Sequence, residues 1–166
     1  LGGFCRRGEI RGLIAEGPGI TQDDMVALVA DDMLHLSPNL GLCCGPLQDI
    51  RITDLHADDC HSFVRLESVF HAIERVEVSN VTGGCRVSAL NADALRYCAN
   101  PLFDPDDPLT REGVGLLDVV SLHGFNVWKT CVHDTPLVML ETRMRSFTAS
   151  SIHRQMLLDQ CPESPL

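Results

Sequence analysis

A six-residue pattern that recurs five times constrains this chain more than any other feature. Its third and sixth positions are apolar in every copy, and its second and fourth are mostly polar. Such alternation is typical of a short strand with one buried face. The fifth position carries Gly, Asp, Asn or Ser, which accept a left-handed backbone or hydrogen-bond to their own backbone, so a sharp bend is predicted there. The copies span residues 8–13, 50–55, 76–81, 120–125 and 142–147.

The spacing of the copies predicts a solenoid. Successive copies begin 42, 26, 44 and 22 residues apart. The short intervals match one solenoid turn, and the long ones fit a turn with an inserted loop or two turns of which one has lost the pattern. Strands one turn apart would stack in parallel about 4.8 Å from each other. We therefore expect a single all-β domain over residues 1–166, a right-handed parallel β-helix with coils over residues 8–150. An antiparallel sandwich is the alternative, but Asn-Gly and Asp-Gly hairpin signals are absent.

A weaker repeat follows the bends. Asp23-Asp24 precedes an apolar Val-x-Leu strand, as Asp58-Asp59 does one copy later, and Gly83-Gly84 stands at the same place in the next copy. This similarity predicts that the two acid pairs share one phase of the coil. It also predicts that Cys60 and Cys85, which follow the second and third of these bends, stack as interior thiols.

The segments between the repeats are expected to be loops and a cap. Residues 31–49 and 98–113 are rich in turn-forming residues, and we expect them to leave the coils and flank one groove. Residues 151–160 carry apolar side chains at helical offsets after a serine, which predicts a short helix that closes the C-terminal end of the stack.

Composition limits the possible partners. The net charge is −10, and Lys129 stands alone beside 12 arginines, which argues against binding to nucleic acid or an anionic membrane. No apolar run is long enough for a membrane span. The chain opens with Leu1-Gly2-Gly3 and shows no signal peptide, so we expect a fragment or a processed form. Eight cysteines without a CxxC pair leave both disulfides and buried thiols open.

The acid pairs are the candidate catalytic groups. Two carboxylates that crowd each other on one flank can supply a protonated acid beside an ionised base, as glycoside hydrolysis requires. The same cluster could bind Ca²⁺, and solvated turns are the plain alternative. A histidine beside the acids could relay a proton. The candidate catalytic residues are Asp58, Asp59, Asp24, Asp23 and His61.

Five further residues are candidates for substrate binding. Arginines near the second strand of each coil could pair with the acids or bind a sugar carboxylate with two hydrogen bonds, and an aromatic ring could stack on a sugar. The spacing of the cluster from His56 to His61 matches no structural zinc site, so we expect no bound metal. The candidates are His56, Arg65, Arg86, Arg96 and Tyr97.

The strand-and-bend copies, together with Asp58-Asp59-Cys60 and Asp23-Asp24-Met25, resemble the pectinase-type right-handed β-helix superfamily, and within it the polygalacturonase-like glycoside hydrolases. Both acid pairs resemble the Asp-Asp of that family's Gly-Asp-Asp motif, with Gln22 and Ala57 in place of its glycine. The family's Gly-His-Gly and Arg-Ile-Lys motifs have no counterpart here.

The resemblance implies a protein that hydrolyses glycosidic bonds in a polysaccharide or oligosaccharide, with Asp acid and base residues in an inverting reaction. It also implies an extracellular or cell-surface location. We expect a monomer and no cofactor, with Ca²⁺ as an open possibility. Two other functions stay open: a non-catalytic carbohydrate-binding or structural module, and a Ca²⁺-dependent polysaccharide lyase with an arginine as base.

Overall fold

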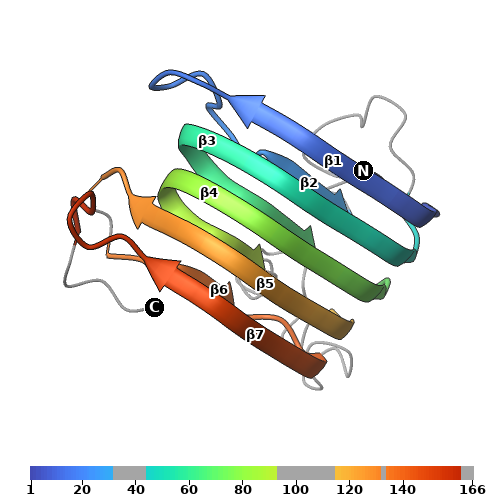
Figure 1. Ribbon diagram of the computed structural model, residues 1–166. Coiled ribbons are helices and arrows are strands. Elements are labelled where there is room, and N and C mark those ends of the chain that lie inside the picture. Colours follow the sequence, from blue (N-terminus) through green and yellow to red (C-terminus); the bar gives the residue numbers. More distant parts are fainter. Residues whose placement is uncertain (32–43, 93–114, 132–133, 162–166) are drawn as a thin grey trace, which may run out of the picture.

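The protein is built from parallel strands in one sheet. A computed structural model describes residues 1–31, 44–92, 115–131 and 134–161, and these residues form seven strands and no helix (Figure 1). Every strand pair is parallel. The strands are β1 (Arg6–Ala15), β2 (Val26–Val29), β3 (Leu47–Glu67), β4 (Ile73–Ala92), β5 (Leu117–Lys129), β6 (Val138–Leu140) and β7 (Met144–Arg154).

The sheet has two arms because β3 and β4 are long and bent. Their first halves belong to an arm with the order β1-β3-β4-β5-β7. Beyond the bend, the second half of β3 pairs with β2 and the second half of β4 pairs with β6. Figure 1 shows both long strands turning from the front arm into the arm behind it. The expectation of stacked parallel strands is therefore confirmed.

Four of the five sequence copies stack in the predicted register. Ile50 lies beside Gly8 on one side and Val76 on the other, and Val76 lies beside Val120. The fifth copy was misplaced: β5 pairs Val120 with Phe147, so the true copy is 147–152 rather than 142–147. The misplacement arose because Met144 and Phe147 satisfy the same apolar positions as a genuine copy. With this correction the last turn has 27 residues, close to the 26 between β3 and β4.

The fifth position bends the backbone as predicted in the first four copies, whereas the bend expected at Ser146 lies at Ser151, the fifth position of the corrected last copy. All five residues there have a positive φ, which directs the sixth residue back toward the interior. Asp54 and Asn80 stack on each other, and the Asn80 side-chain amide donates to the Asp54 carboxylate at 3.1 Å. The φ values are 70° at Gly12, 59° at Asp54, 56° at Asn80, 70° at Gly124 and 54° at Ser151.

Glycine is required where β4 turns into the second arm. The register between β3 and β4 shifts between Ala57 and Cys60, and again before Ser62. Gly83 has φ 120°, and a Cβ there would lie 1.8 Å from the carbonyl oxygen of Ala57. No side chain fits in that space, so the close approach of the two strands depends on this glycine.

The core is a set of apolar ladders between the two arms. Each inward position of one turn stacks on the same position of the next, as in the ladder of Ile52, Val78 and Leu122, and the members are almost completely buried. Branched aliphatic residues suit such ladders because they pack well on a pleated, half-buried surface. Phe63 and Phe125 are the largest apolar side chains among the fully buried residues.

The long intervals are single turns with inserted chain. Strand β1 pairs directly with β3, and β4 with β5, so no complete coil intervenes in either 42- or 44-residue interval. The predicted loop 98–113 lies outside the described residues, and so does most of 31–49. The expectation that both flank one groove therefore stays a prediction. The C-terminal boundary predicted for the loop 31–49 was wrong, because residues 47–49 already form the start of β3.

The predicted C-terminal helix is wrong. Residues 151–154 continue β7 beside β5, and residues 156–158 form a turn. The Arg154 guanidinium pairs with the carboxylate of Asp159, whose side chain is completely buried, and the backbone N–H of Gln160 donates to the Lys129 carbonyl at 2.9 Å. The chain thus continues as a strand through Ser151 and Ile152, although the apolar residues that follow them have helical spacing. No helix in the described ranges has the length and apolarity to cross a membrane.

Candidate functional site

The candidate site lies where the segment between β1 and β2 runs along the bend of β3. Asp58 accepts a hydrogen bond from the backbone N–H of Gly17 at 2.7 Å, and Asp59 accepts one from Gly19 at 3.3 Å. Further along, the N–H of His61 donates to the carbonyl of Asp23 at 3.2 Å. These contacts hold the two acid pairs along the same flank of the molecule.

The two acid pairs do not share one phase of the coil. Val26 pairs with Val64, which places Asp23 beside His61 rather than beside Asp58. Between the paired positions Ala15–Ala57 and Val26–Val64, the β1–β2 connection has ten residues and the bend of β3 has six, a difference that the matching Val-x-Leu motifs concealed. The expected direct pairing of Asp23-Asp24 with Asp58-Asp59 is therefore replaced by pairing with His61 and its neighbour.

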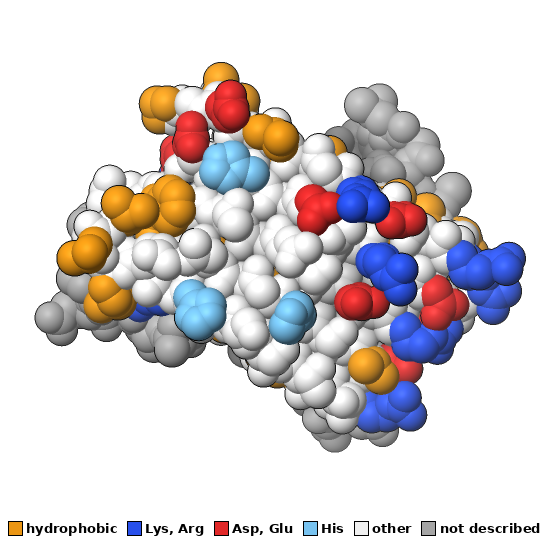
Figure 2. All heavy atoms as spheres, in the orientation of Figure 1, with side chains coloured by type: hydrophobic (Ala, Val, Ile, Leu, Met, Phe, Trp, Pro, Cys, Tyr) orange, Lys and Arg blue, Asp and Glu red, His pale blue; other side chains and the backbone are white. Residues whose placement is uncertain are grey.

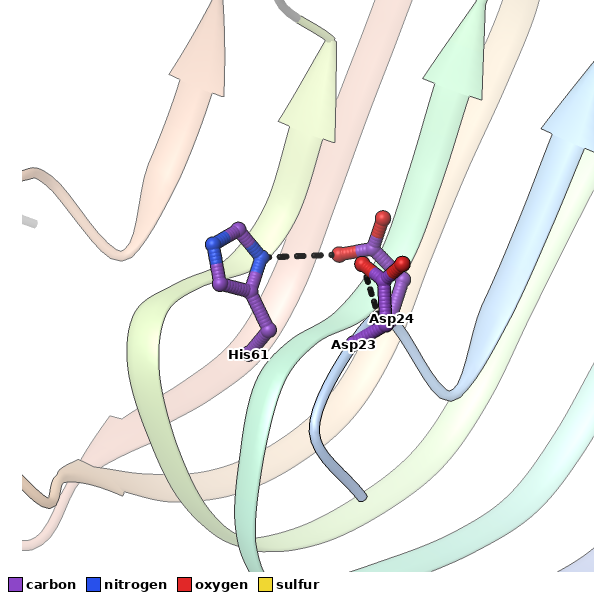
Figure 3. Close-up of side chains that lie close together, drawn as sticks. All are labelled: Asp23, Asp24 and His61. Carbon is purple, nitrogen blue, oxygen red and sulfur yellow. Dashed lines mark hydrogen bonds and ion pairs between the residues drawn. The ribbon is translucent and has the colours of Figure 1, made fainter. Parts of the chain in front are cut away.

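Asp23, Asp24 and His61 form a compact cluster. One ligand atom of each lies within 4.8 Å of the other two (Figure 3). Asp24 Oδ1 and His61 Nδ1 are 3.2 Å apart, and Asp23 Oδ1 accepts the backbone N–H of Asp24 at 2.9 Å. The Asp24 side chain is 4% exposed and the His61 ring is 38% exposed. A buried carboxylate thus holds an accessible imidazole, while Asp23 remains exposed beside it.

Charged side chains extend the cluster along β3. A guanidinium nitrogen of Arg65 lies 4.0 Å from Asp24 Oδ2, and another lies 3.4 Å from Glu67. Asp24 therefore has an imidazole on one side and a guanidinium on the other. Glu67 was not anticipated as part of the site, although its spacing of two from Arg65 on a strand was a usable signal.

Asp59 is held on several sides. Its Oδ1 accepts the Thr130 hydroxyl at 2.6 Å, and its Oδ2 lies 3.3 Å from the Arg86 guanidinium. Arg86 also donates to the carbonyl of Thr21 at 2.8 Å, so it links the β3 bend to the β1–β2 connection. Nothing in the sequence pattern pointed to Thr130, which follows β5 and lies 71 residues from Asp59.

Asp58 is more open than Asp59. Its side chain is 49% exposed, and its carboxylate lies 3.5 Å from Nε2 of His56. The other ring nitrogen of His56 is 2.9 Å from the Thr82 hydroxyl on β4. Asp58 and His56 thus form a second pair on the surface of the same bend. Of the other predicted binding residues, Arg96 and Tyr97 lie outside the described part of the chain.

The donor set of the cluster suits Ca²⁺ poorly. Ca²⁺ takes six to eight oxygen ligands, whereas one of the three donors in this cluster is an imidazole nitrogen. The guanidinium of Arg65 beside Asp24 further opposes a second cation. We therefore assign no step of the chemistry to Ca²⁺.

The cysteines at the bend are structural. Cys60 and Cys85 stack on each other and are completely buried, as the sequence predicted. Burial raises the pKa of both thiols, that of Cys85 to about 12, so neither supplies a thiolate at neutral pH. Among the described cysteines none forms a disulfide; the free thiols are Cys5, Cys44, Cys60, Cys85, Cys131 and Cys161.

A groove of about 430 Å³ lies elsewhere, over the N-terminal halves of β1, β3 and β4. Figure 2 shows acidic and basic side chains interleaved over that part of the sheet. They neutralise one another across neighbouring strands: Arg51 pairs with Glu77 at 3.3 Å, and Arg75 pairs with Asp49. The hydrogen bond from Arg75 lowers the pKa of Asp49. The charged side chains that line the groove thus compensate one another, and we place the candidate site at the bend of β3.

Comparisons with known proteins identify no relative. No protein-family model matches the chain, and searches of curated proteins and of solved structures also find no match. The functional argument therefore depends on the residues of this chain.

Proposed function

We propose that the chain is a right-handed parallel β-helix. The ladders that continue around the bends of β3 and β4, with turns of 26 and 27 residues, support this architecture. Connections between parallel strands of one sheet are right-handed in about 98% of cases, which supports the hand.

We propose that this β-helix hydrolyses glycosidic bonds of a polysaccharide on the flank formed by the β3 bend. The observation that carries the proposal is the convergence of Asp23, Asp24 and His61 on that flank (Figure 3). A carboxylate close to a group that gives and takes a proton is the arrangement that hydrolyses a glycosidic bond in two displacements.

The burial of the three groups assigns their roles. Asp24 accepts a hydrogen bond from His61 and fixes the ring, whose exposed side exchanges a proton with the substrate and with water. The exposed Asp23 carboxylate attacks the anomeric carbon while His61 gives a proton to the departing glycosidic oxygen, which leaves the sugar bound to Asp23 as an ester. His61 then takes a proton from a water molecule, whose oxygen replaces Asp23 at the anomeric carbon, so both side chains return to their starting states.

Asp58 and Asp59 have a positioning role in this proposal. Their hydrogen bonds to Gly17 and Gly19 hold the connection that carries Asp23 and Asp24 against β3. This assignment differs from the one based on sequence, which made Asp58 and Asp59 the acid and base.

The same contacts favour a second candidate function, a non-catalytic carbohydrate-binding module. Asp59 is occupied by Arg86, Thr130 and Gly19, so its carboxylate resembles a structural anchor more than a proton donor. In that case the exposed His56 and Asp58 would contact a sugar through hydrogen bonds alone.

Incubation with a panel of plant and bacterial polysaccharides separates these functions. The hydrolase predicts new reducing ends without an unsaturated product, whereas a lyase would produce the ultraviolet absorbance of a new double bond. A binding module would retain a polysaccharide on an affinity matrix and release no reducing ends. If the protein neither cleaves nor binds any member of the panel, the carbohydrate proposal fails.

A further inference from the structure

Among the described residues, the two outermost strands of the long arm each have one edge that pairs with no other strand. Within the described ranges, β1 pairs only with β3, and β7 pairs only with β5. An unpaired strand edge is a template for another strand. The inward side chains of these strands are also incompletely covered: Leu13 on β1 is 37% exposed, and Phe147 and Ile152 on β7 are only partly buried.

The stacking rule of the molecule fixes how β7 and a second copy of β1 would meet. At each step within the molecule, the bend residue of one strand lies beside the bend residue of the next. Applied once more, the rule places Ser151 of one copy beside Gly12 of the second. Both have a positive φ, 54° and 70°, so the two strands bend at the same point.

The inward side chains complement each other in size in this register. Phe147 would meet Gly8, which has no side chain, and Ala149 would meet Ile10. Large residues thus lie beside small ones in two successive positions, whereas the inner ladders stack residues of similar size, such as Ile52 on Val78. The third inward pair would be Ile152 on Leu13, both aliphatic.

The outward side chains are also compatible over most of the strand. Glu9 of the second copy would face Thr148, and Arg11 would face Ser150. Along this central part, each charge meets a hydroxyl group that can hydrogen-bond to it. At the start of the strands, Arg6 would face Arg145, and both of these side chains are exposed.

We propose that β7 of one molecule binds β1 of a second copy, edge to edge and in parallel, so that the solenoid continues across the two molecules. Such a head-to-tail contact uses two different surfaces and does not close on itself, so it extends to chains of several copies. This inference goes beyond the proposed function and differs from the expectation of a monomer.

The proposed contact can be tested by placing a negative or a positive charge at Thr148. This residue is exposed and would face the exposed Glu9 of the second copy. Like charges on directly opposite positions of neighbouring strands destabilise the pair, and opposite charges stabilise it. In sedimentation velocity over a range of concentrations, the wild type should form species larger than a dimer. Thr148→Glu should raise the concentration needed for association severalfold, and Thr148→Lys should lower it.

The charge-reversed pair Glu9→Lys with Thr148→Glu is the matched control, and it should restore association toward the wild-type level. Thermal unfolding of each variant checks that the fold is intact. The proposal is overturned by a monomer at every concentration, by association that stops at a dimer, or by Glu and Lys at position 148 acting in the same direction.

Discussion

Asp31 shows how a single carboxylate holds two turns of this molecule together. Its Oδ2 accepts backbone N–H groups from Val69, Phe70 and His71 at 2.7–2.8 Å, and its Oδ1 pairs with the His71 ring. Asp31 is 5% exposed and follows β2, while the three donors form the connection between β3 and β4. The residue thus fixes a corner of the coil.

Replacing Asp31 by Ala should destabilise the protein by about 3 kcal/mol, because three backbone N–H groups, one of them buried, lose a charged acceptor. Urea unfolding measures the change. The control is Asp118→Ala, which breaks the ion pair with Arg145, whose side chain is 70% exposed. That change should cost less than about 1 kcal/mol. Equal losses in the two variants would contradict the role assigned to Asp31.

The buried thiols predict a loss of stability in alkali. Folding raises the pKa of Cys60 and Cys85 above the ordinary value of 9.0, that of Cys85 to about 12. The unfolded chain therefore releases these protons first, so their contribution is complete below pH 9 and is lost as the pH rises toward 12. Above pH 9, each buried thiol should lower the free energy of unfolding by about 1.4 kcal/mol per pH unit.

The test compares the wild type with a double variant that carries both Cys60→Ala and Cys85→Ala. The free energy of unfolding of each protein is measured in urea at several pH values from 7 to about 11. Lys129 is also buried, and desolvation lowers its pKa, so its own titration has the opposite sign. Because Lys129 is present in both proteins, the difference between them reports mainly on the thiols. A double variant as sensitive to alkali as the wild type would refute the prediction.

At the scale of the strands, the alternating pattern predicted four of the five front strands in register. The prediction succeeded because both the inward apolar ladder and the bend are local properties: Asp54 and Asn80 signal a positive φ by their residue type alone. It failed at β7, where Met144 and Phe147 imitate a copy in the wrong frame.

The candidate site was harder to predict than the strands. Its flank and most of its residues followed from the acid pairs, but the phase of Asp23 depends on how many residues the bend of β3 consumes. It also depends on the length of the β1–β2 connection, residues 16–25, and no sequence signature marks how either segment pairs with the other. The contact of Thr130 with Asp59 joins residues two turns apart and requires the assembled stack.

The bend of β4 gives a prediction at this scale. Gly83→Ala should destabilise the protein by about 3 kcal/mol or more, because the new Cβ would overlap the backbone of Ala57 and the strands would have to separate. Gly12→Ala is the matched control, since Gly12 also has a positive φ but no atom lies within 4 Å of its would-be Cβ. That change should cost only about 1–2 kcal/mol. Chemical denaturation measures the free energy of unfolding of both variants. A smaller loss of stability in Gly83→Ala than in Gly12→Ala would show that the close approach of the strands does not destabilise the Gly83 variant.

At the scale of the whole molecule, the stack brings distant segments to one flank. Residues 16–25 reach the bend of β3 only because β1 and β3 are neighbours in the sheet. Arg86 of β4 then joins the two segments through Asp59 and Thr21. The stacked strands thus position a connecting segment that carries the exposed Asp23, an arrangement that is common for binding and catalytic residues.

The central claim is that the pair of Asp24 and His61 activates water on this flank. It is tested most directly by reducing-end release from the polysaccharide that the panel identifies, measured in parallel with binding of that polysaccharide. Asp24→Asn should lower turnover about 100-fold or more while binding persists, because the neutral amide no longer stabilises the protonated ring and can donate to Nδ1 instead of accepting from it. Asp118→Asn, on the exposed ion pair, should leave both unchanged. Turnover in Asp24→Asn equal to the wild type would contradict the claim.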